Sequence, residues 1–238
     1  MAFKSHLPNL LTSVNLTCGC LAIICALDSN SYQMLWATYL IWIAAFFDFL
    51  DGMAARLLKS YSELGKQLDS LADMVSFGVA PGLILYSLIR EEASFDDQWM
   101  AYFALVIPLF SALRLAKFNI DENQSDSFIG LPTPANAMLI GSLPLLLLKG
   151  DERISMHINS PEVLASIGVV MSLLLVSKIG MFSLKVKSLA WKSNELVYTF
   201  LALSALIIFI FPYAALPIII LLYILISTGQ SLSLKLKK

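Results

Sequence analysis

The sequence has little charge for its length. Only 14% of its 238 residues are Asp, Glu, Lys or Arg, whereas 58% are hydrophobic and the mean hydropathy is +0.77. A soluble domain carries roughly 25% charged residues, so this composition excludes a soluble globular protein and indicates an integral membrane protein. The formal net charge is −1 and no basic block is present, so no nucleic acid partner is expected.

Cysteine and histidine are also scarce. Cys18, Cys20 and Cys25 fall within one apolar segment, where their spacing makes neither a disulfide framework nor a zinc site. We expect them to face lipid or to pack as small apolar side chains. His6 and His157 are isolated from each other, and neither is expected to take part in chemistry.

Long apolar segments make up most of the chain. A membrane span needs roughly 20 mostly apolar residues, and eight segments qualify: 9–27, 34–58, 66–89, 98–118, 132–148, 161–181, 194–210 and 213–229. The first lacks a small-residue cleavage site, so we expect it to remain as a helix. The sequence therefore predicts an all-α fold, a polytopic membrane helix bundle of about eight transmembrane helices. It is expected to form a single integral membrane domain over residues 1–238.

The segments that connect these spans sort by charge. One set carries Lys4, Lys59, Lys66, Lys117, Lys178, Lys185, Lys187, Lys192, Lys235, Lys237 and Lys238. The opposite set carries Asp28, Glu91, Glu92, Asp96, Asp97 and the mixed stretch 149–153. The positive-inside rule places the lysine-bearing set, and with it both termini, in the cytoplasm.

Four aspartates and an arginine interrupt two of the predicted spans. They stand in the order Asp48-x-x-Asp51-Gly52-x-x-Ala55-Arg56, then, after eight residues, Gly65-x-x-x-Asp69-x-x-x-Asp73. An aspartate at membrane depth costs about 2.5–3.5 kcal/mol, so four unpaired carboxylates would cost on the order of 10 kcal/mol. One arginine cannot balance them, and bound divalent cations can. A helix cap, an ion pair or a proton relay would explain any single aspartate, but not the glycines and the alanine as well.

The spacing of these residues favours a two-metal site. Residues three or four apart share one face of a helix, so Asp48 and Asp51 form one stripe, and Asp69 and Asp73 form another. If the stripes face each other, the all-oxygen cluster suits Mg²⁺ or Mn²⁺. Two such ions about 3.5–4 Å apart would clamp the attacking and leaving oxygens of a phosphoryl transfer. Arg56 is placed to bind a phosphate oxygen.

The two blocks together resemble the signature of the CDP-alcohol phosphotransferase family, and every fixed position is matched. The resemblance implies a membrane enzyme, a homodimer, in which an alcohol hydroxyl displaces CMP from a CDP-linked lipid with the help of two divalent cations. It implies a catalytic core in spans one to six, about residues 8–181, followed by two additional spans in 194–229. With the charge pattern it also implies a bacterial inner (cytoplasmic) membrane location and an active site at the cytoplasmic face. The implied metal ligands are Asp48, Asp51, Asp69 and Asp73.

The resemblance also assigns finer roles. Asp73 would be the base that takes the proton from the attacking hydroxyl. The implied contacts of the CDP-lipid are Asn9, Thr12, Gly52, Ala55, Arg56, Ser62 and Gly65. For Asn9 and Thr12 a structural alternative stays open: Pro8 could begin the first helix, and the two side chains could satisfy its free N–H groups.

The acceptor alcohol is indicated by a second resemblance. Residues 114–119 and 128–136 resemble the phosphatidylserine synthase branch, which implies transfer of a phosphatidyl group from CDP-diacylglycerol to L-serine. An amino-acid acceptor needs a cation for its carboxylate, and Arg114 is a fork-shaped donor suited to it. The implied serine contacts are Arg114, Lys117, Asn119, Thr133 and Asn136. The branch commonly has a second arginine where this chain has Lys117, and a small residue where it has Asn136.

Several alternatives remain at this stage. Arg114 and Lys117 could be membrane anchors alone. Glycerol 3-phosphate, inositol phosphate or choline could be the acceptor, although a phosphorylated acceptor would want extra basic residues and choline an aromatic cage. A cation-coupled transporter would place its carboxylates near the midplane within inverted repeats, and no repeat is visible. A prenyltransferase would not explain the glycines, Ala55 and Arg56 together.

Overall fold

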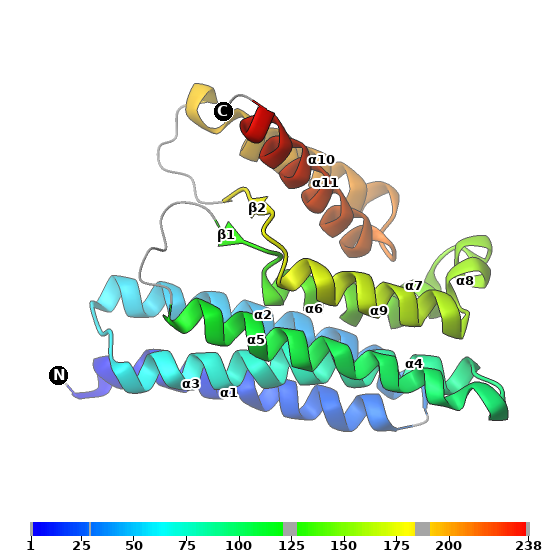
Figure 1. Cartoon of the computed structure of the whole chain (residues 1–238). Coiled ribbons are helices and arrows are strands. Elements are labelled where there is room, and N and C mark those ends of the chain that lie inside the picture. Colours follow the sequence, from blue (N-terminus) through cyan, green and yellow to red (C-terminus); the bar gives the residue numbers. More distant parts are fainter. Residues whose placement is uncertain (1, 29, 121–127, 184–190, 237–238) are drawn as a thin grey trace.

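The protein is a bundle of long parallel and antiparallel rods (Figure 1). The computed structural model describes residues 2–28, 30–120, 128–183 and 191–236. Two rods are the single helices α1 (Ala2–Leu27) and α2 (Ser31–Leu58). The third combines α3 (Glu63–Asp73), η1 (Met74–Val79) and α4 (Ala80–Glu92), and the fourth combines η2 (Phe95–Leu105) and α5 (Val106–Ile120). The predicted all-α membrane bundle is confirmed at this level.

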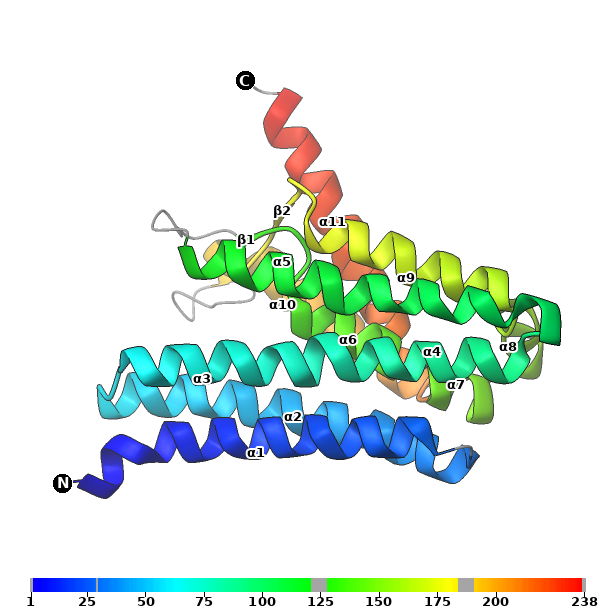
Figure 2. The ribbon, with the colours of Figure 1, turned by 60° about the horizontal axis from the view of Figure 1, so that its bottom comes forward.

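The second half of the chain covers one side of these rods. Its elements are β1 (Phe128–Ile129), α6 (Thr133–Gly141), α7 (Leu143–Lys149), α8 (Glu152–Ile158), α9 (Pro161–Leu175), β2 (Gly180–Met181), α10 (Trp191–Ile210) and α11 (Ala215–Leu236). Helix α9 packs on α4, η2 and α5, whereas α11 packs on α6 and β2. The hairpin of α10 and α11 lies outermost, at an angle to the rods (Figures 1 and 2).

Fewer helices than predicted are long enough to cross a membrane. Within the described ranges five meet the requirements of length and hydropathy, or up to six if α8 and α9, bent by 77°, count as one span. The five correspond to the first four predicted spans and the last one. The other three predicted spans are shorter or broken: 132–148 is divided into α6 and α7, the helix expected over 161–181 ends at Leu175, and the apolar part of α10 is a short helix.

Tertiary contacts explain two of these differences. At Ser142, between α6 and α7, the hydroxyl accepts a hydrogen bond from Trp42 Nε1 at 3.3 Å, and Pro144 lies in the first turn of α7. After α9, the chain pairs with residues 128–131 instead of continuing the helix. The Leu131 N–H bonds to the Leu174 carbonyl and the Gly130 N–H to the Ile179 carbonyl, each at 2.9 Å. A ladder of two residue pairs leaves no alternating pattern in the sequence, so these strands were not predicted.

Helix α1 begins earlier than expected. It starts at Ala2, so Pro8 lies inside the helix. The alternative in which Pro8 begins the helix, with Asn9 and Thr12 capping it, is therefore wrong. The cysteines of α1 are free thiols, as predicted: Cys18 is buried, Cys20 is exposed and Cys25 lies between.

A π-helical turn between α3 and α4 sets the register in which α1 packs against them. The π-helical η1 follows Asp73 directly, and such turns are rare and often found at functional sites. Gly19 of α1 packs against this turn so closely that a Cβ atom there would lie 2.8 Å from Ser76 Cα. The Ser76 hydroxyl also donates to the Asn15 carbonyl at 3.0 Å. These contacts set the register of α1 against Asp73.

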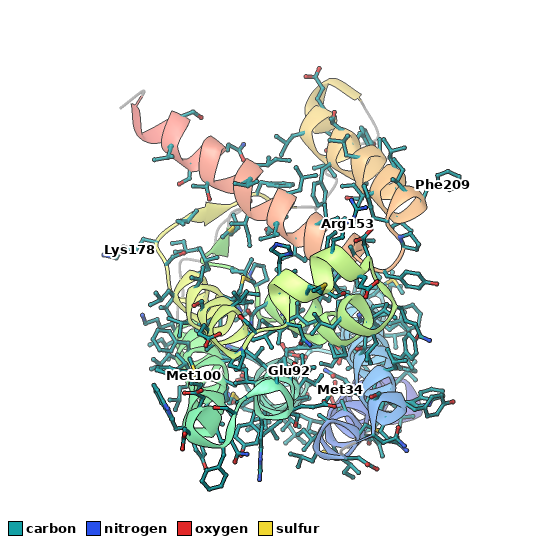
Figure 3. All side chains as sticks on the ribbon, turned by 90° about the vertical axis from the view of Figure 1, so that its right-hand side faces the viewer. Met34, Glu92, Met100, Arg153, Lys178 and Phe209 are labelled. Atoms are coloured by element: carbon teal, nitrogen blue, oxygen red, sulfur yellow. The ribbon has the colours of Figure 1, made fainter. Side chains whose placement is uncertain are left out.

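The two ends of the bundle differ in charge. The N-terminus, the α2–α3 loop and the end of α5 lie on the left in Figures 1 and 2, and this end carries Lys59, Lys66 and Lys117. The α4–η2 connection lies on the right, and Figure 3 looks onto that end, where Met34, Glu92 and Met100 are labelled. Of the lysines used to predict the orientation, Lys185, Lys187, Lys237 and Lys238 lie outside the described residues.

Candidate active site

The four aspartates come together between α2 and α3. Asp48, Asp51 and Asp69 each offer a carboxylate oxygen, and these oxygens all lie within 4.8 Å of one another. The Asp73 carboxyl lies against that of Asp48 and interacts electrostatically with Asp69 and Asp51. The two predicted stripes therefore do face each other. We refer to these four side chains as the aspartate cluster.

The geometry of the aspartate cluster is compatible with a divalent cation. Mg²⁺ binds oxygen ligands at about 2.0–2.1 Å in an octahedron, so two ligand oxygens are roughly 2.9 Å apart when adjacent and roughly 4.2 Å apart when opposite. The oxygens of Asp48, Asp51 and Asp69 lie no more than 4.8 Å apart, which exceeds the larger of these separations only slightly. Asp69 Oδ1 is buried and has no hydrogen-bond partner, as expected of an oxygen that serves as a metal ligand.

Helix α1 supplies neutral donors to this cluster. The Thr12 hydroxyl donates to Asp51 Oδ2 at 2.7 Å, and Asn15 Nδ2 donates to Asp73 Oδ1 at 3.4 Å. Asn15 is fully buried, and its own Oδ1 has no partner. The sequence analysis missed Asn15, although its place three residues after Thr12 puts both on one helix face. Neutral donors orient the carboxylates without neutralising them.

A cavity of about 580 Å³ opens beside the cluster. Every residue predicted to contact the CDP-lipid lines it, together with Asp48, Asp51 and Asp69. The sequence analysis missed further lining residues, namely Phe49, Ser60, Tyr61, Lys66 and Phe118. Of these, Lys66 had a visible signal, because it follows Gly65 directly and brings a cation to a site that was expected to hold phosphates.

The two signature glycines have different structural roles. A Cβ atom on Gly52 would meet nothing within 4 Å, so Gly52 faces open space in the cavity. A Cβ atom on Gly65 would lie 2.9 Å from Asn9 Oδ1 and 3.0 Å from Ser62 Oγ, so Gly65 lets these side chains pack. Ser62 caps α3, because its hydroxyl oxygen accepts the Gly65 N–H at 3.0 Å. Arg56 Nε donates to the Gly52 carbonyl at 2.9 Å, which holds the guanidinium along the cavity wall.

Three of the predicted serine contacts gather in the interior next to the cluster. Arg114 Nη1 donates to Thr133 Oγ1 at 3.2 Å, and the guanidinium interacts electrostatically with Asp73. Asn136 lies one helical turn after Thr133 and is fully buried, and neither polar atom of its side-chain amide has a hydrogen-bond partner. Arg114 and Thr133 are therefore joined inside the bundle, and Asn136 lies on the same face of α6 as Thr133.

The other two predicted serine contacts are placed differently. Lys117 is exposed, and it is not among the described residues that line the cavity. Asn119 Nδ2 donates to Ser70 Oγ at 2.9 Å, and the Asn119 carbonyl accepts from Lys66 Nζ at 3.5 Å. Asn119 thus joins the end of α5 to α3. The structure does not bring Lys117 or Asn119 to the polar group around Arg114.

The comparison with known families fits this geometry. The family model described as CDP-alcohol phosphatidyltransferase matches residues 5–176. That range contains the whole aspartate cluster and every residue that lines the cavity. The chain belongs to the CDP-alcohol phosphatidyltransferase family.

Curated relatives resemble the chain over much of its length. A protein of Helicobacter pylori (strain ATCC 700392 / 26695) is 36% identical over 232 residues, which cover 97% of this chain and 92% of the relative. One of Bacillus subtilis (strain 168) is 38% identical over 151 residues, 61% of this chain and 82% of the relative. One of Methanocaldococcus jannaschii is 35% identical over 169 residues, 71% of this chain and 70% of the relative. All three are named CDP-diacylglycerol–serine O-phosphatidyltransferase.

Proposed function

We propose that this protein transfers the phosphatidyl group of CDP-diacylglycerol to the hydroxyl of L-serine and releases CMP. The observation that carries the proposal is the aspartate cluster, three of whose four members line a cavity large enough for a nucleotide. Family membership supports the reaction type. The relatives named for the serine reaction support the acceptor, because the similarity to the Helicobacter pylori protein extends over nearly the whole chain.

The cavity is the proposed site of the CDP-lipid. The open space over Gly52 would receive a flat group such as the cytosine ring, and Arg56 and Lys66 would meet the diphosphate. The other proposed contacts are Asn9, Thr12, Ala55, Ser62 and Gly65. For Thr12, Ser62 and Gly65 the hydrogen bonds and packing described above suggest an indirect role, in which they shape the cavity and orient Asp51.

Two divalent cations, Mg²⁺ or Mn²⁺, complete the proposed site. Asp48, Asp51 and Asp69 would hold one ion, and Asp73 with its neighbouring carboxylates would hold the other. Bound cations would neutralise the diphosphate and lower the pKa of a coordinated hydroxyl. Asp73, oriented by Asn15, accepts the proton of the serine hydroxyl. Phosphoryl transfer depends mostly on positioning and charge neutralisation, and this site offers both.

The reaction is proposed to be one in-line displacement. The serine oxygen forms a bond to the phosphorus that carries the lipid, the bond from that phosphorus to the CMP oxygen breaks, and CMP leaves with the electron pair. This step requires no nucleophilic side chain of the protein, because the serine oxygen attacks the phosphorus directly. A chiral phosphate substrate tests the step: inversion at phosphorus is expected, and retention would require a covalent intermediate.

The acceptor is proposed to bind beside Arg114. Its guanidinium would meet the serine carboxylate, and Thr133 and Asn136 would contact the acceptor or hold the arginine in place. Since Arg114 also interacts with Asp73, a carboxylate held there would bring the serine hydroxyl toward the base. Lys117 and Asn119 are not proposed as contacts, because one is exposed and the other bonds to Ser70.

The protein is proposed to work at the cytoplasmic face of a bacterial inner membrane. The cavity lies at the bundle end that carries Lys59 and Lys66, opposite the acidic end, and the positive-inside rule turns the basic end to the cytoplasm. We propose a single domain with its catalytic core in about residues 8–181, close to the family match. Eight crossings with both termini cytoplasmic, and a homodimer, are proposed from the sequence and the family resemblance.

A CMP-release assay tests the function directly. Purified protein, CDP-diacylglycerol micelles and Mn²⁺ are combined with serine, glycerol 3-phosphate, inositol phosphate or choline in parallel. We expect serine-dependent CMP release and labelled phosphatidylserine, both abolished by a chelator and restored by added metal. CMP release with another acceptor but not with serine would refute the serine assignment and leave the reaction type intact.

A further inference from the structure

Helix α11 brings two buried polar side chains to the acceptor end of the site. Tyr223 and Ser227, one helical turn apart, are only 6% and 0% exposed. Polar side chains within a membrane span are costly and usually functional. Helix α11 packs on α6, the helix of Thr133 and Asn136. It lies outside residues 5–176, so the family match assigns it no role.

The Tyr223 phenol is held in one orientation. Its hydroxyl donates to the Phe182 carbonyl at 2.9 Å, and its ring centroid lies 4.8 Å from that of Phe182 and 6.0 Å from that of Phe200. A phenol has one proton to donate, so the oxygen remains as an acceptor only. This oxygen interacts electrostatically with the Arg114 guanidinium. The bond to Phe182 therefore uses the phenol's only proton and leaves its lone pairs for the Ser227 hydroxyl and the Arg114 guanidinium.

Arg114 and Asn136 have buried polar atoms without a partner. Arg114 uses Nη1 on Thr133, while its Nε is buried and unpaired. The Asn136 amide nitrogen and oxygen are unpaired, and the Ser227 hydroxyl has no partner other than the Tyr223 phenol beside it. Buried polar groups are nearly always hydrogen-bonded. Unpaired donors and acceptors on α5 and α6, with the polar side chains of α11 beside them, therefore favour a small polar ligand with an anionic group for Arg114.

We propose that α11 forms the third wall of the acceptor site, with Tyr223 as a positioning residue for Arg114 and Ser227 as a residue that determines specificity. Tyr223 and Thr133 hold the guanidinium from two sides, so that its free donors meet the acceptor carboxylate. The Ser227 hydroxyl and the Asn136 amide form hydrogen bonds with the remaining polar groups of the acceptor. This inference rests on the proposed function and assigns the C-terminal hairpin a part in it.

The test compares two substitutions with two matched controls. Tyr223→Phe keeps the ring packing and removes the phenol oxygen, and Ser227→Ala removes one hydroxyl. Tyr86→Phe removes a phenol that accepts from Arg90 Nη1 at 3.2 Å toward the acidic end of the bundle. Ser204→Ala removes a buried hydroxyl that bonds to the Phe200 carbonyl of its own helix at 2.8 Å. Steady-state kinetics give the KM for serine and for CDP-diacylglycerol, and thermal unfolding with CDP-diacylglycerol reports folding.

We expect Tyr223→Phe and Ser227→Ala to raise the KM for serine about tenfold, to change the KM for CDP-diacylglycerol less than twofold, and to keep stabilisation by the lipid. The controls should leave both constants unchanged. In an Arg114→Ala background, Tyr223→Phe should cause no further rise in the KM for serine, since a positioning residue acts only through its partner.

Other results would overturn the proposal in distinguishable ways. A serine KM within twofold of the wild type in both variants would remove α11 from the acceptor site and leave the proposed function standing. Equal rises in both KM values, or loss of stabilisation by the lipid, would show a purely structural role. Absence of serine-dependent CMP release in the wild-type protein would refute the proposed function and this inference together.

Discussion

Gly52 offers a sharp test of the cavity, because a substitution there separates folding from binding. The Cβ atom of Gly52→Ala would meet no protein atom within 4 Å, so the folded protein accommodates it. Alanine in a helix interior is more favourable than glycine by roughly 0.5–1 kcal/mol. The free energy of unfolding should therefore stay the same or rise.

Binding of the CDP-lipid should respond in the opposite direction. A ligand atom packed on the Gly52 Cα lies about 3.5–4.0 Å away, and a Cα–Cβ bond of about 1.5 Å would bring the new methyl to about 2–2.5 Å from it. The ligand must then move by more than about 1 Å, and a displacement of that size can cost about 10²-fold in rate. We expect kcat/KM for CDP-diacylglycerol to fall about 100-fold, equivalent to about 2.7 kcal/mol.

The assay is CMP release as a function of CDP-diacylglycerol concentration, with thermal unfolding in parallel. Gly229→Ala is the matched control, since a Cβ atom there also meets nothing within 4 Å, but on α11. It should show the same gain in helix stability with unchanged kinetics. Wild-type kcat/KM in a folded Gly52→Ala variant would refute the placement of the CDP-lipid over this glycine.

Four further changes have expected outcomes. Replacing any one member of the aspartate cluster with asparagine should abolish turnover and remove the stabilisation by Mn²⁺ in thermal unfolding, and activity retained in any two of these variants would contradict the metal assignment. Asn15→Ala should lower kcat about tenfold with little change in either KM, whereas Ser13→Ala, on the exposed face of α1, should have no effect. Arg114→Lys, which keeps the charge and loses the fork, should raise the KM for serine more than that for CDP-diacylglycerol, and equal rises would place Arg114 elsewhere. Gly19→Ala should lower the melting temperature, because its Cβ atom would lie 2.8 Å from the Ser76 Cα, a backbone atom that cannot move aside easily, and an unchanged melting temperature would contradict that packing.

The aspartate cluster could be predicted because its geometry follows from local rules. The spacing within each block fixes which side chains share a helix face. The short connection, from Lys59 to Ser62, turns the chain back at the end of α2, so α3 runs antiparallel to it and the two stripes can meet. Charge at membrane depth then leaves few arrangements other than two stripes that face each other.

The residues that were missed depend on contacts between distant parts of the chain. Asn15 reaches Asp73 only because Gly19 and Ser76 set the register of α1 against η1. The break at Ser142 depends on Trp42, which is 100 residues away in the sequence. No helical period or spacing records such contacts, so the sequence predicted eight long helices where the described part of the chain has five or six of that length and hydropathy.

The same reason explains the mixed result for the serine contacts. Arg114 and Thr133 were predicted from resemblance, and the structure brings them into hydrogen bond. Asn119 has the right type and position along the chain, yet it bonds to Ser70. Tyr223 was not considered, since nothing in the sequence of an apolar helix indicates which of its faces meets α6.

The most direct test of the central claim is a count of bound metal ions. Purified protein is equilibrated with Mn²⁺ and CDP-diacylglycerol, and bound Mn²⁺ per chain is measured by electron paramagnetic resonance of the free ion, beside the Asp69→Asn variant. We predict two tightly bound ions in the wild-type chain and a loss of tight binding in the variant. The same binding in both proteins, or no tight binding in either, would contradict the assignment of the aspartate cluster as a metal site.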